Sequence, residues 1–190
     1  MVEPVAVAIH AVNRASFCNG DTIAVIGAGP IGLLTLQAAK AAGAGKVICL
    51  DVLDERLGMA KELGADEIIN VSDGNIPAEI ADVVFETAGS SKATESIYTL
   101  SRPGGVAVQV GWPEKNKVAM DIAQFIEKEL NYVGVNRYAN AYPAAIKWVS
   151  DGRINVEKLI THRFNFEQIA EAFEFTATNK KDVIKTIVLN

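Results

Sequence analysis

The segment TIAVIGAGPIG, residues 22–32, places an apolar, β-branched run directly before a G-x-G-x-x-G turn. An alanine-rich helical pattern follows, and a second apolar run then ends at Asp51, about 20 residues after the turn. A strand, a glycine-rich turn, a helix and a second strand that ends in an acid form the fingerprint of a dinucleotide-binding unit. The segment therefore predicts a βαβ fold with a nucleotide bound at the turn.

Each glycine of this turn has its own physical task. Gly27 permits the tight turn, Gly29 lets the backbone approach a pyrophosphate, and Gly32 lets helix and strand pack closely. The phosphates would then lie against the free N–H groups and the positive dipole end of the helix that starts at about Ile31.

The acid at the end of the second strand indicates which cofactor is bound. The carboxylate of Asp51 can accept hydrogen bonds from both hydroxyls of an adenosine ribose, and it would repel a 2′-phosphate. We therefore expect NAD rather than NADP. S-adenosylmethionine enzymes also place an acid at this strand end, so a nucleotide-dependent transferase stays an alternative, as does a plain turn-forming role for Asp51.

Composition and charge exclude several other classes of protein. The 190 residues are 49% hydrophobic and 22% charged, with a formal net charge of −5, as in an ordinary folded α/β domain. Nothing in this balance favours a nucleic-acid partner, and no apolar run approaches the roughly 20 residues that span a membrane. We expect a cytoplasmic protein. Cys18 and Cys49 form neither a C-x-x-C pair nor a cluster with histidine, and Cys49 reads as a small buried hydrophobe.

Strand and helix patterns alternate along the first 140 residues. The expected strands cover residues 22–26, 47–51, 67–70, 81–87, 105–111 and 130–137, and the expected helices 4–16, 31–42 and 54–63. This rhythm predicts a Rossmann fold, a doubly wound α/β domain with a parallel sheet of six strands. Residues 71–80 are too few for a full crossover helix, so we expect about one helical turn there or a shortened chain.

The last third of the chain differs in character. We expect a helix at 141–150, a strand at 159–164, a helix at 166–176 and an apolar strand at 183–189. Because the six-stranded sheet is complete before that last strand, we expect it to join a second sheet whose other strands lie outside this chain. The predicted division is a nucleotide-binding domain at residues 1–152, into which the helix 4–16 leads, and a separate segment at 153–190.

Several segments carry a resemblance to a known family. They read EPVAV at residues 3–7, KELGAD at 61–66, ETAG at 86–89, GVNRYANAYP at 134–143 and LITHRF at 159–164. With the glycine-rich turn, they make the chain similar to the C-terminal half of the zinc-dependent medium-chain alcohol dehydrogenases, and most similar to the sorbitol (polyol, L-iditol) dehydrogenase branch. The resemblance covers nearly the whole chain and implies that residues 153–190 belong to an otherwise absent catalytic, GroES-like domain.

The resemblance also implies a set of site residues. Those on the pyrophosphate and adenosine side of NAD would be Gly27, Gly29, Pro30, Ile31, Gly32, Asp51 and Arg56. Those that line and close over the nicotinamide end would be Val110, Gly111, Trp112, Val135, Asn136 and Arg137. Arg137 and Tyr138 would also reach the substrate hydroxyls, and Glu3 would lie beside the catalytic zinc, binding it or its water and the polyol.

Each implied role has a structural alternative. Arg56 also reads as an exposed helix charge, Trp112 and Tyr138 as packing aromatics, and Glu3 as an acid that the helix dipole favours. His10 and His162 have no neighbouring partner and are given no role.

One feature of the family is absent from the sequence. Family members carry their first zinc-binding Cys and His on an N-terminal domain, and a catalytic zinc needs about three protein ligands. We therefore expect zinc only in a complete enzyme, with the missing N-terminal catalytic domain as partner, and no activity from this chain alone.

Three functions stay open for the chain, and the nucleotide-dependent transferase named above is the third. The leading one is the NAD-binding half of an enzyme that oxidises a sorbitol-like polyol at a secondary alcohol to a ketose, by zinc-assisted hydride transfer. The alternative is a free-standing NAD(H)-binding module or sensor without catalysis. The resemblance also implies a homo-oligomer, because family members associate through the edge of this sheet, and we expect it to be built on the strand region 130–137 or on the loop before it.

Overall fold

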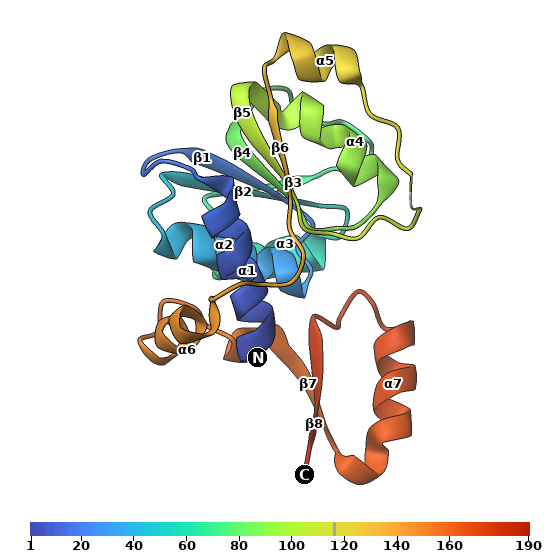
Figure 1. The fold of residues 1–190 in the computed structure, drawn as a ribbon. Helices are drawn as coiled ribbons and strands as arrows, with labels where there is room; N and C mark the ends of the chain where they lie inside the picture. The colour runs from blue at the N-terminus through green and yellow to red at the C-terminus, as the bar shows by residue number, and fades with distance from the viewer. Residues whose placement is uncertain (116) are drawn as a thin grey trace.

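A six-stranded parallel sheet with the strand order β3-β2-β1-β4-β5-β6 forms the centre of the molecule (Figure 1). The computed structural model describes residues 1–115 and 117–190. The strands are β1 (Thr22–Ile26), β2 (Lys46–Asp51), β3 (Glu67–Asn70), β4 (Ala81–Glu86), β5 (Ser101–Gln109) and β6 (Asn131–Gly134). This order reverses between β1 and β4, which confirms the predicted Rossmann fold.

Helices cover both faces of the sheet. They are α1 (Val2–Ala15), α2 (Pro30–Ala41), α3 (Asp54–Glu62), α4 (Ser91–Leu100), α5 (Ile122–Glu127) and α6 (Tyr142–Ser150). Along β1, Ile23 and Val25 point into the core shared with α1 and α2, whereas Ala24 and Ile26 point into the core shared with α4. The strand is therefore apolar throughout because both of its faces are buried.

The crossover from β3 to β4 is a loop. The described residues 71–80 contain no helical turn, so the expectation of one turn was wrong; a hydrogen-bonded turn takes its place, in which the Gly74 N–H donates to the Val71 carbonyl at 3.0 Å. Val71 and Ile76 pack against the core on the α4 side. On this face a loop therefore covers a part of the sheet that a crossover helix covers elsewhere in such folds.

The C-terminal part builds a second, smaller sheet. It comprises the 3-10 helices η1 (Glu157–Leu159) and η2 (Phe166–Gln168), the strands β7 (Ile160–Asn165) and β8 (Lys185–Leu189), and the helix α7 (Ile169–Thr178). β7 and β8 pair in parallel, so the expectation that the other strands of this sheet lie outside the chain was wrong for one partner, because β7 is within it. In Figure 1 these elements project from the end of the first domain beside the N-terminus, and the C-terminus lies at their far tip.

Burial differs between the two parts. Ile154, Leu159 and Ile184 belong to the core cluster under α1 and α2, which connects the C-terminal part to the first domain. By contrast, Phe166 and Phe173 of the C-terminal part are exposed. Within the described residues, no helix is long and apolar enough to cross a membrane.

Candidate nucleotide-binding site

A cavity of about 900 Å³ opens at the carboxyl ends of β1, β2 and β4. Of the residues expected at a nucleotide site, those in its wall are Gly27, Gly29, Pro30, Asp51 and Arg56. The wall also includes segments for which the sequence analysis expected no site residue, namely the crossover loop at residues 71–74 and 76, Thr87 and Ala88 after β4, and one side of α4. The cavity lies where open α/β sheets bind their ligands, outside the carboxyl ends of the strands at the reversal of strand order.

The glycine-rich turn shows why two of its glycines are required. Gly27 has φ +96°, a left-handed conformation that side chains rarely adopt, and its N–H donates to the Leu50 carbonyl at 2.7 Å. A Cβ atom on Gly32 would come within 1.7 Å of the Gly27 carbonyl oxygen. These two glycines are therefore fixed by the packing of the turn against the sheet and the helix.

Gly29 has a different reason to lack a side chain. A Cβ atom on Gly29 would meet no protein atom within 4 Å, because it would point into open space at the cavity wall. Gly29 is also the N-cap of α2 and has no side chain with which to cap the helix. The first N–H groups of α2, at Ile31 and Gly32, are therefore left without a side-chain acceptor and can meet an anionic ligand.

The carboxylate of Asp51 is held in one orientation. Its Oδ2 accepts from the Ala28 N–H at 2.6 Å, and its Oδ1 accepts from the N–H groups of Val52 at 2.8 Å and Leu53 at 3.0 Å. The residue is only 8% exposed, yet it lies in the cavity wall. Two carboxylate oxygens offer about four lone pairs, so at least one remains for a hydroxyl donor. Burial, together with the charge of Asp51, raises the pKa of the neighbouring Cys49 thiol to about 12, which fits the expected small buried hydrophobe.

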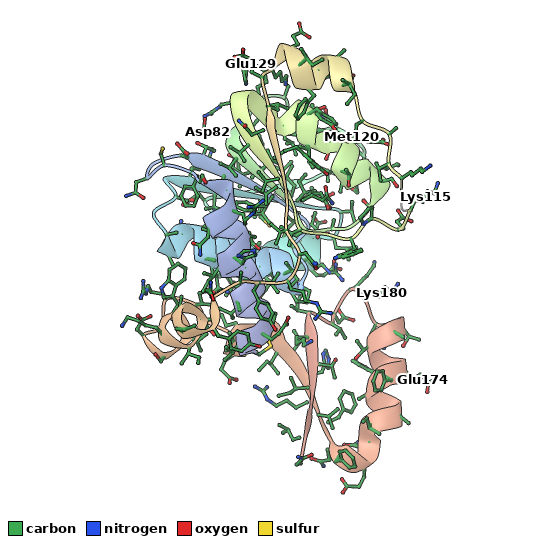
Figure 2. The ribbon with its side chains drawn as sticks, in the orientation of Figure 1. Asp82, Lys115, Met120, Glu129, Glu174 and Lys180 are labelled. Atoms are coloured by element: carbon green, nitrogen blue, oxygen red, sulfur yellow. The ribbon has the colours of Figure 1, made fainter. Side chains whose placement is uncertain are left out.

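Arg56 links the cavity to the C-terminal part. Its Nη2 donates to the Lys180 carbonyl at 2.9 Å, and Figure 2 shows Lys180 in the loop before β8, on the side nearest the first domain. Its Nε is buried and, among the described residues, has no hydrogen-bond acceptor. A buried guanidinium N–H without an acceptor is costly, so a ligand oxygen at this place would satisfy it. The open space at Gly29 and the unsatisfied Nε both fit a phosphate- and ribose-containing cofactor.

The residues expected at the nicotinamide end lie outside the wall of this cavity, over β4, β5 and β6. The N–H groups of Val110 and Gly111 both donate to the Glu86 carbonyl at 2.9 Å, and the Val135 N–H donates to the Gln109 carbonyl at 3.0 Å. Val110 and Val135 are buried, whereas Trp112 is 80% exposed. Asn136 and Arg137 are exposed, and Arg137 has φ +55°.

Of the residues expected near substrate and metal, Glu3 lies in the first turn of α1 and Tyr138 lies against the first residue of α6. Tyr138 and Tyr142 make an edge contact with ring centroids 5.1 Å apart. The pKa of Tyr142 is raised. The largest cause is a hydrogen bond with Tyr138, and the smaller causes are burial and the nearby charges of Tyr138 and Glu3. Glu3 itself is exposed in the first turn of α1. No three His, Cys, Asp or Glu side chains of the described residues could hold a metal ion together, so these residues alone do not fit a catalytic zinc.

Comparison with known proteins identifies relatives of the whole chain. The family model for zinc-binding dehydrogenases matches residues 30–151. The sorbitol dehydrogenase of Bacillus subtilis (strain 168) is 36% identical over 99% of this chain and 56% of its own length. The L-idonate 5-dehydrogenase of Vitis vinifera is 37% identical over 93% of this chain and 52% of its own length. The chain therefore spans about half the length of these curated relatives.

Solved structures agree on the fold. The L-idonate 5-dehydrogenase of Escherichia coli K-12 superposes with a TM-score of 0.93 at 30% identity, over 100% of this chain and 56% of its own. An alcohol dehydrogenase from Escherichia coli CFT073, solved in complex with NADH, gives a TM-score of 0.90 at 30% identity, over 100% of this chain and 58% of its own.

Proposed function

The chain belongs to the zinc-binding dehydrogenase family, and from this premise we propose that it is the NAD-binding part of a polyol dehydrogenase. The observation that carries the proposal is the cavity in which the oriented carboxylate of Asp51 and the open backbone at Gly29 share one wall. Residues 1–152 would form the NAD-binding domain, and residues 153–190 would pack against a catalytic domain.

Each part of the cavity has a role in this proposal. The pyrophosphate would lie on the first turn of α2, where Ile31 and Gly32 present their N–H groups, and Asp51 would accept hydrogen bonds from the adenosine ribose. The buried Nε of Arg56 would donate to a ribose or phosphate oxygen. Bound NAD would supply the hydride acceptor for the oxidation of a secondary alcohol. The chain's own contribution is to bind and orient the cofactor.

The substrate class follows from the relatives and from the second group of residues. The relatives named above are sorbitol and L-idonate dehydrogenases, which are named for polyhydroxylated substrates. Glu3, Arg137 and Tyr138 would hydrogen-bond the hydroxyl groups of such a substrate, and oxidation of one secondary alcohol to a ketone would turn a sugar alcohol into a ketose. Because the described residues do not fit a catalytic zinc, its ligands would come from outside them.

Titration of the purified chain with NADH and with NADPH tests the proposal. We expect NADH to bind more tightly by about tenfold or more, because a 2′-phosphate would meet the carboxylate of Asp51 in a partly buried site. Calorimetry and nicotinamide fluorescence report the two affinities. Failure to bind either nucleotide would overturn the proposal, and a zinc-dependent rate of polyol oxidation by the chain alone would overturn the assignment of the zinc ligands.

We also propose that the chain self-associates through the edge of its large sheet. β6 is the last strand of that sheet, and Ile122 and Ile126 of the helix before it are exposed. Sedimentation velocity over a range of concentrations checks this, and a monomer at the highest concentration would contradict it.

A further inference from the structure

The carboxyl group of Glu86 lies fully buried at the carboxyl end of β4, outside the wall of the cavity described above. Its Oε1 accepts from the N–H groups of Ala88 and Gly89, each at 2.8 Å, and its Oε2 accepts from Nε2 of Gln109 at 2.5 Å. Burial raises the pKa of Glu86, against the effect of these three donors. A buried carboxyl group surrounded by donors fixes the backbone that supplies them.

Gln109 extends this contact across two further strands. Its Nε2 also donates to the Gly111 carbonyl at 2.8 Å, and its Oε1 accepts from the Tyr132 hydroxyl at 2.9 Å. The network of Glu86, Gln109 and Tyr132 therefore begins on β4, passes through β5 and ends on β6. It holds the loop at residues 87–89 through one carboxylate oxygen and the exit of β5 through the other.

The two loops held by Glu86 approach each other too closely for side chains. A Cβ atom on Gly111 would come within 2.5 Å of the Gly89 nitrogen and 2.6 Å of Glu86 Oε2. A Cβ atom on Gly89, which has φ +69°, would come within 2.6 Å of the Trp112 carbonyl oxygen. Backbone therefore lies against backbone directly over the buried carboxyl group, and the spacing of the two loops depends on it.

The position of these loops relative to the cavity indicates what they support. With the adenosine ribose at Asp51 on β2, a dinucleotide that crosses the edge of the sheet places its second nucleotide over β4, β5 and β6. We propose that Glu86 is a positioning residue for the nicotinamide end of NAD, an inference that rests on the proposed NAD site. Glu86 touches no part of the cofactor, because it is buried beneath the loops at residues 87–89 and 110–112, and it acts through their spacing.

The test compares two ligands that differ only by the nicotinamide ring. ADP-ribose keeps the adenosine, the pyrophosphate and the second ribose of NADH. In the unaltered chain we expect NADH to bind more tightly than ADP-ribose. In Glu86→Gln, an amide NH₂ group replaces one acceptor oxygen. This new donor then faces one of the N–H donors that surround Glu86. We expect NADH affinity to fall about tenfold while ADP-ribose affinity changes by less than about twofold.

Two further variants separate positioning from a general loss of stability. Val83→Ala removes buried methyl groups from the same strand, so it should lower the midpoint of unfolding without changing the ratio of the two affinities. Gln109→Met keeps the backbone contacts of Glu86 and removes the bridge to Gly111. It should therefore lower the ratio of NADH to ADP-ribose affinity by less than Glu86→Gln does. If Glu86→Gln fails to fold, an unchanged ratio in Gln109→Met overturns the inference.

Fluorescence provides a readout that a purely structural role would not change. Trp112 lies in the loop at residues 110–112, whose position depends on Glu86, so energy transfer from tryptophan to bound NADH should decrease in Glu86→Gln at saturating ligand. Equal weakening of NADH and ADP-ribose in this variant, or equal affinities in the unaltered chain, would overturn the inference. Failure of the unaltered chain to bind either ligand would instead overturn the proposed function.

Discussion

Asp51 and Glu86 are buried carboxyl groups at the same edge of one sheet, at the ends of β2 and β4, yet they face different surroundings. Asp51 is 8% exposed in the wall of the cavity. The N–H groups that donate hydrogen bonds to it come from the glycine-rich turn and from the loop that follows Asp51 itself. Glu86 is 0% exposed, and backbone and Gln109 surround it. A buried acid at this edge can thus contact a ligand directly, or it can fix the backbone that contacts the ligand. The exposure of its carboxyl group determines which of these roles it has.

The largest effect should come from the turn that Asp51 helps to hold. Gly32→Ala would place a Cβ atom 1.7 Å from the Gly27 carbonyl oxygen, so the turn must move. We expect the free energy of unfolding to fall by about 3 kcal/mol, with loss of NADH binding. Urea unfolding and NADH titration measure the two effects.

Gly29→Ala is the matched control within the same turn. Its new Cβ atom meets no protein atom, so the variant should unfold like the unaltered chain and yet bind NADH at least about tenfold more weakly. Normal NADH binding by Gly29→Ala would mean that no ligand approaches the backbone here, which removes one of the two observations on which the site rests.

Asp51→Asn should have the next largest effect, because it removes the charge that faces the cavity. Asparagine keeps only one acceptor oxygen, so either the Ala28 N–H or the N–H groups of Val52 and Leu53 lose their acceptor, and some stability should be lost as well. We expect the preference for NADH over NADPH to decrease about tenfold. Asp73 also lines the cavity, and its Oδ1 accepts from the Asn75 N–H within the crossover loop. Asp73→Asn is therefore the control, and an equal loss of preference in that variant would show that Asp51 has no special role.

The Asp51 side of the site could be predicted because its signals are local in sequence. The strand, the turn and the acid at the strand end lie within residues 22–51, and each follows from backbone sterics or from burial on two faces. The same reasoning predicted β3 at Glu67–Asn70 to the residue, but it placed β5 at residues 105–111 instead of Ser101–Gln109 and predicted neither α4 nor α5. The local sequence pattern was enough to predict the structure wherever a segment determines its own conformation.

The Glu86 side could not be predicted in the same way, because its network forms between strands. Glu86, Gln109 and Tyr132 lie far apart in sequence and meet only when β4, β5 and β6 align. The second sheet also depends on pairing between strands that are distant in sequence. Nothing in the sequence of β8 indicates that β7 is its partner. The motif at residues 86–89 carries part of the family resemblance, but its physical reason lies in tertiary contacts.

The effect of pH sharpens the comparison further. Burial raises the pKa of Glu86, so the folded chain holds this proton more tightly than the unfolded chain, whose Glu pKa is about 4.5. The stability of the unaltered chain relative to Glu86→Gln should therefore be highest below about pH 4.5 and should decrease as the pH rises through the raised pKa of Glu86. Chemical unfolding of both variants across this range measures the difference.

Other titrating groups cancel in that difference. Burial acts to raise the pKa of Asp66, but hydrogen bonds from the Val47 N–H and Lys40 lower it overall, so its contribution to stability is lost as the pH falls. Asp66 is present in both variants and contributes equally to each. A stability difference that rises with pH would mean that the donors around Glu86 outweigh its burial.

Tyr132→Phe should have the smallest effect, because it removes only the outer end of the network. The Tyr132 hydroxyl donates to Gln109 Oε1 at 2.9 Å, but the residue is 37% exposed, so water can replace it. We expect a loss of less than about 1 kcal/mol in the free energy of unfolding and less than about a twofold change in the ratio of NADH to ADP-ribose affinity. Tyr98→Phe is the control, since its buried hydroxyl has no hydrogen-bond partner among the described residues and its removal should cost nothing. A change in the ratio as large as that of Glu86→Gln would place the support of the nicotinamide end on β6 rather than on the buried carboxyl group.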